Sequence, residues 1–139
     1  MLAKSIPWNE LGCAYPILSF SGTTGRHDIL TYKPDIIITD INMPGIDGLK
    51  MIEMCKDTLP NSKIIFISAY DYFSYAAKAI KLHAFGYLLK PFANEELIKL
   101  ISDAVYNHLI YMYPEKRPRD LNRNSTKDMT TVNSLLVER

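Results

Sequence analysis

Three short apolar runs dominate the middle of the chain. They are Ile36-Ile37-Ile38, Ile64-Ile65-Phe66-Ile67 and Phe85-Gly86-Tyr87-Leu88-Leu89. Each run is too short for a helix and none alternates with polar positions, which is typical of strands buried on both faces of a parallel sheet. We therefore predict three parallel strands at these positions.

Helical patterns occupy the intervals between and after these runs. Apolar residues recur every three or four positions over 49–55, 73–80 and 97–105, which is the period of a helix with one buried stripe. Residues 35–108 therefore alternate strand and helix. Because the crossovers between parallel strands are right-handed, this order predicts an α/β fold, a doubly wound parallel sheet with helices on both faces.

The two ends of the chain carry weaker patterns. Pro7–Leu11 ends a predicted helix, and Ala14–Ser19 is a candidate strand in which Pro16 favours an edge position or a broken strand. Residues 114–134 are polar, with Pro114 and Pro118 among them. We interpret residues 1–108 as one domain and residues 109–139 as a linker or disordered tail, with no output domain after it.

Composition narrows the classes of partner. The 139-residue chain is 47% hydrophobic and 22% charged, with a net charge of +1, which fits one globular domain and gives no basic excess for a general nucleic-acid or membrane-surface binder. Cys13 and Cys55 have no metal-binding spacing. No apolar run is long enough to span a membrane and no signal peptide is visible, so we expect a cytoplasmic protein without membrane contacts.

Polar residues follow the predicted strands. Asp40, Ser68 and Lys90 each stand at the carboxyl end of one strand, and ligands of open α/β sheets bind beyond those ends. The three side chains should therefore converge. A carboxylate can act as a nucleophile toward phosphorus, while an ammonium and a hydroxyl can hold phosphoryl oxygens. The set predicts a site that handles a phosphoryl group.

The segments around these residues resemble the receiver domains of response regulators in bacterial two-component systems. Lys33–Gly48 resembles the phosphoacceptor segment, Ser68-Ala69 the switch hydroxyl and its small neighbour, and Tyr87–Phe92 the switch aromatic and the lysine–proline corner. The resemblance covers about residues 6–106 and implies a flavodoxin-like fold with strand order 2-1-3-4-5.

The resemblance implies a role for each matching residue. Asp40 would accept a phosphoryl group from a phosphohistidine of a sensor histidine kinase, and the backbone carbonyl of Asn42 would bind Mg²⁺ together with Asp40. Ser68 and Lys90 would bind the phosphoryl oxygens. Tyr87 would rotate inward as the Ser68 hydroxyl moves. The implied domain is a signalling switch and not an enzyme.

Further implications concern the Lys90-Pro91 corner and the partners. The resemblance implies a cis peptide before Pro91. Apart from the resemblance, we expect the face of residues 72–106 to bind a partner or a second copy of the chain in a homodimer. Pro7–Gly12 resembles a segment of regulators with an AraC-type helix-turn-helix output, so transcription would be controlled through DNA bound by an output domain that this sequence lacks.

One departure from the family pattern changes these expectations. Receiver domains begin with an interior strand that ends in two acidic residues, and no such segment precedes Asp40; Glu10 aligns elsewhere. We therefore expect an N-terminally truncated receiver lacking the first strand and part of the first helix. Its Mg²⁺ binding should be weak or absent, and the edge of its 35–40 strand should be exposed.

Two other interpretations remain open. The missing acids favour a degenerate, phosphorylation-independent receiver that acts as a protein-interaction module, or a non-functional fragment. An aspartyl-nucleophile hydrolase would also form a phospho-aspartate at a strand end, but such enzymes usually carry a second Asp two residues on, where this chain has Asn42.

Overall fold

The computed structural model of the protein describes residues 2–116 and 132–138. The described residues form a five-stranded parallel sheet in the order β1-β5-β2-β3-β4. The strands are β1 (Ile17–Ser19), β2 (Ile36–Asp40), β3 (Lys63–Ser68), β4 (Gly86–Leu89) and β5 (Ser134–Val137). The three strands predicted from the apolar runs are thus confirmed.

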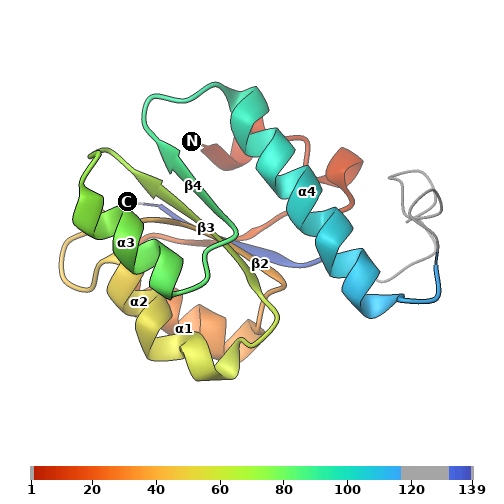
Figure 1. The fold of residues 1–139 in the computed structure, drawn as a ribbon, viewed down its shortest axis with the longest axis horizontal. Helices are drawn as coiled ribbons and strands as arrows, with labels where there is room; N and C mark the ends of the chain where they lie inside the picture. The colour runs from red at the N-terminus through yellow and green to blue at the C-terminus, as the bar shows by residue number, and fades with distance from the viewer. Residues whose placement is uncertain (1, 117–131, 139) are drawn as a thin grey trace.

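Helices cover both faces of the sheet (Figure 1). One face carries α1 (Gly22–Tyr32), α2 (Gly48–Cys55) and α3 (Phe73–Lys81), with the short 3₁₀ helix η3 (Lys56–Thr58) after α2. The other face carries α4 (Asn94–Met112) and the 3₁₀ helices η1 (Leu2–Ser5) and η2 (Asn9–Leu11). The predicted doubly wound α/β fold is confirmed. Within the described ranges, no helix is both long and apolar enough to cross a membrane.

Alternate side chains of β2 pack into two separate hydrophobic cores, one on each face of the sheet. Ile36 and Ile38 pack with α4 and the N-terminal 3₁₀ helices, whereas Ile37 packs with α1 and α2. All three side chains are fully buried. This two-sided burial explains why the strand is an unbroken apolar run and not an alternating one.

The strand next to β2 contradicts the prediction from the sequence. The interior position predicted to be empty is filled by β5, which pairs in parallel with β1 on one side and β2 on the other. Ile37 lies opposite Leu135 and Ile38 opposite Leu136. The edge of β2 is therefore covered, and the exposed edge that we expected does not exist.

The interpretation of 109–139 as a linker or tail fails for the same reason. Helix α4 continues to Met112, and β5 lies in the middle of the sheet; residues 117–131 lie outside the described residues. Leu135, Leu136 and Val137 are at most 1% exposed. Burial of three aliphatic side chains offsets the small extra entropic cost of closing a long connection.

Polar contacts set the register where β5 begins. Asp35 N–H donates to the Asn133 carbonyl at 2.9 Å, and Asn133 N–H donates back to Asp35 Oδ2 at 3.0 Å. Cys13, whose backbone forms an isolated parallel β-bridge with Val132, is buried nearby. Burial and the Asp35 carboxylate raise the pKa of Cys13 to about 12, so its thiol stays protonated at neutral pH.

Strand β1 lies at one edge of the sheet, as predicted from the sequence. β1 pairs only with β5 among the described strands, as the position of Pro16 predicts. Gly12 closes η2 with a positive φ of 83°, a conformation that glycine adopts without strain.

Removing part of β5 should cost much of the stability of the protein. Leu136→Ala deletes a side chain that is 1% exposed, and we expect the free energy of unfolding to fall by about 2–5 kcal/mol. Urea denaturation followed by far-UV circular dichroism measures this quantity.

Leu30→Ala is the matched control, because Leu30 is 39% exposed on α1; it should change the free energy of unfolding by less than about 0.5 kcal/mol. Equal effects of the two substitutions would show that β5 is not packed in the sheet.

Candidate functional site

Asp40 and Lys90 form an ion pair at the carboxyl edge of the sheet. Asp40 is the last residue of β2, and Lys90 directly follows β4. Lys90 Nζ lies 3.2 Å from Asp40 Oδ1, with the Asp40 side chain 11% exposed and that of Lys90 49% exposed. A largely buried carboxylate beside a solvent-accessible cation is the charge arrangement that a phosphoryl acceptor requires.

Close backbone packing holds Asp40 in place. Gly48 N–H donates to the Ile41 carbonyl at 3.0 Å, and a Cβ atom at Gly48 would collide with the carbonyl oxygen of Asp40. The side chain of Asp47 caps α2 by accepting a hydrogen bond from Lys50 N–H at 2.7 Å. The loop from β2 to α2 is therefore anchored by a glycine that no larger residue can replace without a shift of the Asp40 backbone.

The hydroxyl of Ser68 is held by the loop that follows its own strand. Ser68 Oγ donates toward the Tyr70 carbonyl at 2.9 Å and toward Asn42 Oδ1 at 3.3 Å, and it accepts from Tyr70 N–H at 3.0 Å. Because a hydroxyl carries one proton, the two acceptors compete for it. In this structure Ser68 is thus directed to Asn42 and the 69–70 loop.

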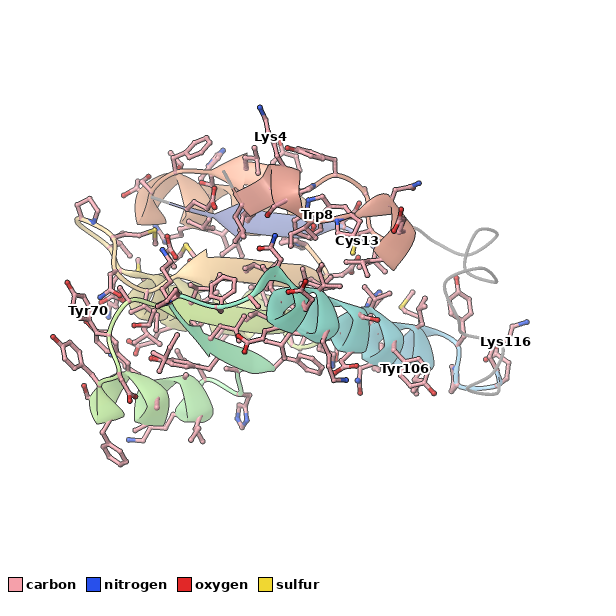
Figure 2. All side chains as sticks on the ribbon, turned by 90° about the horizontal axis from the view of Figure 1, so that it is seen from above. Lys4, Trp8, Cys13, Tyr70, Tyr106 and Lys116 are labelled. Carbon is pink, nitrogen blue, oxygen red and sulfur yellow. The ribbon has the colours of Figure 1, made fainter. Side chains whose placement is uncertain are left out.

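Asn42 joins three segments of the site. Its Nδ2 donates to the Tyr75 hydroxyl at 3.1 Å, and its Oδ1 also accepts from Ala69 N–H at 3.4 Å. Figure 2 shows Tyr70 at the end of the molecule toward which the strands point. A cavity of about 390 Å³ opens here, lined by Asp40, Asn42, Ala69, Tyr70 and Lys90.

Tyr87 lies on β4 with its hydroxyl turned into the protein. The side chain packs against the core formed with α2 and α3. Its hydroxyl oxygen is buried and has no hydrogen-bond partner among the described residues. This inward, unsatisfied position distinguishes Tyr87 from Tyr70 and Tyr72, which are about half exposed and stack on each other with ring centroids 5.1 Å apart.

Glu138 is a residue of this edge that the sequence analysis missed. It follows β5 directly, and its Oε1 accepts a hydrogen bond from Leu2 N–H at 3.2 Å. The Lys90-Pro91 peptide is cis, as predicted. A second cavity, of about 700 Å³, is lined by Leu2, Ser5, Asp40, Lys90, Pro91, Phe92, Asn94 and Glu138.

The structure thus brings together most of the predicted site residues. Asp40 and Lys90 line both cavities, Asn42 lines one and Pro91 the other. Ser68 joins them through Asn42, whereas Tyr87 stays in the core. The described residues contain no group of three or more His, Cys, Asp or Glu side chains that could hold a metal ion.

Comparison with known proteins gives a consistent result. The family model described as the response regulator receiver domain matches residues 19–102. The chain is 32% identical over 104 residues to the uncharacterized transcriptional regulatory protein YesN of Bacillus subtilis, covering 75% of this chain and 28% of that protein. It is 35% identical over 92 residues to the DNA-binding transcriptional regulator NtrC of Klebsiella pneumoniae, covering 66% of this chain and 20% of that protein.

Solved structures agree with the sequence relatives. The REC domain of AraT, a response regulator from Geobacillus stearothermophilus, superposes with a TM-score of 0.71 at 30% identity, covering 83% of this chain and 87% of that chain. The structural match thus spans nearly a whole REC domain, whereas this chain covers less than a third of YesN and of NtrC.

Removing the Tyr87 hydroxyl should not destabilise the protein. Because this buried oxygen has no partner among the described residues, we expect Tyr87→Phe to leave the free energy of unfolding unchanged or to raise it by up to about 1 kcal/mol. Urea denaturation measures the change, with Tyr72→Phe at a half-exposed position as the control. A loss above about 1 kcal/mol in Tyr87→Phe alone would mean that the hydroxyl makes a stabilising hydrogen bond.

Proposed function

Because the chain belongs to the response-regulator receiver family, we propose that it is a phosphorylation switch in which Asp40 accepts a phosphoryl group from a phosphohistidine of a sensor histidine kinase. The observation that carries this proposal is the ion pair between Asp40 and Lys90, 3.2 Å long, at the carboxyl edge of the sheet. Both residues line the same two cavities, through which a phosphodonor can approach.

The transfer is a displacement at phosphorus. A carboxylate oxygen of Asp40 forms the new P–O bond while the P–N bond to the imidazole breaks, and the bonding electron pair stays on the imidazole nitrogen. The product is an acyl phosphate. Lys90 leaves its contact with the carboxylate oxygen and binds a phosphoryl oxygen, so its positive charge offsets the added negative charge.

Ser68 supplies the conformational response. In the present structure its hydroxyl donates to the Tyr70 carbonyl and Asn42. A phosphoryl oxygen on Asp40 is a stronger acceptor than either, since it is charged. The Ser68 hydroxyl then turns toward the phosphoryl group, and the 69–70 loop loses one of its anchors. Tyr87 already lies inward while Ser68 is held by the 69–70 loop, so the proposed response consists of the movement of Ser68 and this loop.

The implied cofactor is Mg²⁺, which binds oxygen ligands. Oxygen donors are what this edge of the sheet offers: we propose that Asp40 and the Asn42 backbone carbonyl hold the ion, and both residues line one cavity. When bound, Mg²⁺ neutralises charge on the transferring phosphoryl group. With only these two protein ligands its binding would be weak.

A second candidate function is a phosphorylation-independent interaction module. The observation that favours it is the exposure of large apolar side chains on α3: Phe73 is 87% exposed and Ile80 is 75% exposed. Seven residues apart, they lie on one side of the helix. This side belongs to the face of residues 72–106, through which a homodimer would form.

Regulation of transcription is part of the proposal for the whole protein. The names of YesN and NtrC describe transcriptional regulators, and this chain corresponds to a minor part of each. We propose that DNA is bound by an output domain coupled to this receiver, and not by the residues described here.

The switch predicts one covalent modification. Incubation with acetyl phosphate and Mg²⁺ should add a single phosphoryl group to the intact protein, and Asp40→Asn should abolish the addition because the nucleophilic carboxylate is gone. Intact-protein mass spectrometry detects the product. Asp57→Asn, at an exposed carboxylate on η3, is the matched control and should be modified like the wild type.

Two results would contradict the switch: no added mass in the wild type, or unchanged addition in Asp40→Asn. Light scattering on the same samples separates the second candidate. The switch predicts more dimer after phosphorylation, whereas the interaction module predicts an equal dimer fraction with and without phosphodonor.

A further inference from the structure

Strand β5 connects two parts of the sheet that do not otherwise pair. Among the described residues, β1 pairs with β5 alone, and β2 meets β1 only through β5. In Figure 2 the blue strand lies beside β2, next to the N-terminal 3₁₀ helices. The backbone position of Glu138, directly after β5, is therefore set by two neighbouring strands.

The pairing register of β5 with β2 places Glu138 next to Asp40. Thr39 lies opposite Val137 in the parallel ladder, so the next residue of each strand is Asp40 on one side and Glu138 on the other. Glu138 N–H donates to the Ser19 carbonyl at 2.9 Å, which anchors its backbone to β1. Two acidic residues that lie far apart in the sequence are thus neighbours at one edge of the sheet.

Within the part of the chain that the structure describes, one of the two carboxylate oxygens of Glu138 has a hydrogen-bond donor. One oxygen, Oε1, accepts from Leu2 N–H at 3.2 Å. The side chain lines the 700 Å³ cavity together with Asp40 and Lys90, and it is partly exposed. The chemistry of this donor set is two carboxylates and carbonyl oxygens beside a water-accessible cavity, which suits a hard divalent cation that keeps several waters.

We propose that the segment 132–138 replaces a first strand both in the sheet and in the chemistry of the site: Glu138 is a second carboxylate ligand, with Asp40, for a divalent cation. This inference rests on the proposed function, in which Mg²⁺ assists phosphoryl transfer to Asp40. From the sequence we expected a metal site without a second acidic residue. Here Glu138, close to the C-terminal end of the chain, supplies that acidic residue.

A cation titration tests this assignment without any phosphoryl transfer. Mn²⁺ replaces Mg²⁺ as the probe, and electron paramagnetic resonance measures free Mn²⁺ in the presence of the full chain. Glu138→Gln keeps the size of the side chain and removes its charge, and we expect it to weaken Mn²⁺ binding by about tenfold or more, because ligand charge sets the affinity of such sites. Glu138→Asp should retain part of the affinity.

Two controls keep the result interpretable. Glu10→Gln removes an exposed glutamate that does not line the cavity, and it should bind Mn²⁺ like the wild type. Far-UV circular dichroism of Glu138→Gln should match that of the wild type, since the substitution leaves the backbone hydrogen bond to Ser19 intact. Wild-type affinity in Glu138→Gln, or no Mn²⁺ binding by the wild-type chain, would overturn the inference.

The outcome is separable from that of the proposed function. Weaker Mn²⁺ binding in Glu138→Gln, with no phosphoryl group ever found on Asp40, would uphold the cation site and refute the phosphorylation switch. Phosphorylation of Asp40 with equal Mn²⁺ affinity in the wild type and Glu138→Gln would uphold the switch and refute the role of Glu138.

Discussion

The two-sided pairing of β5 is the interaction on which the rest of the structure depends. Through it β1 joins the sheet, and through it the side of β2 that faces away from β3 is paired over Ile36–Thr39. An uncovered β2 would expose a row of backbone donors and acceptors beside fully buried isoleucines, a surface that invites aggregation. The same strand contributes Leu136 to one core and Leu135 and Val137 to the other. The complete sheet, both cores and the acidic edge therefore all depend on the packing of β5 between β1 and β2.

The parallel topology of the sheet brings the polar residues of the site together at one edge. Because all five strands of the described sheet run the same way, their carboxyl ends form one edge, and residues at the ends of β2, β3, β4 and β5 line two cavities there. Asp40 and Lys90 meet across β3 for this reason, although they are far apart in sequence. The hydrogen bonds of Asn42 to Ser68, Ala69 and Tyr75 hold the loops around that edge. A phosphoryl group bound there would compete directly with these contacts.

The pattern of apolar and polar residues predicted the strands whose burial depends on their own side chains. The runs of β2 and β3 are apolar because both faces are buried, whereas β4 is an apolar, half-buried strand at one edge of the sheet. The polar residues after these runs mark the site in advance. β5 escaped detection because Leu135-Leu136-Val137 is short and follows a polar tract, and because its partners lie about a hundred residues away in sequence. Glu138 escaped for the same reason, since its position depends on strand order and not on any neighbour in the chain. Tyr70 and Tyr75 meet Ser68 and Asn42 through loop geometry, which residue spacing does not encode.

Hydrogen–deuterium exchange of the segment 132–138, followed by mass spectrometry, tests the central claim most directly. Amides paired in the interior of a sheet exchange only when the structure opens. The account predicts that peptides covering β5 exchange as slowly as those covering β2, and far more slowly than an unstructured peptide of the same sequence. Exchange of β5 at the unprotected rate, with β2 still protected, would contradict the docking of this strand and the acidic edge built upon it.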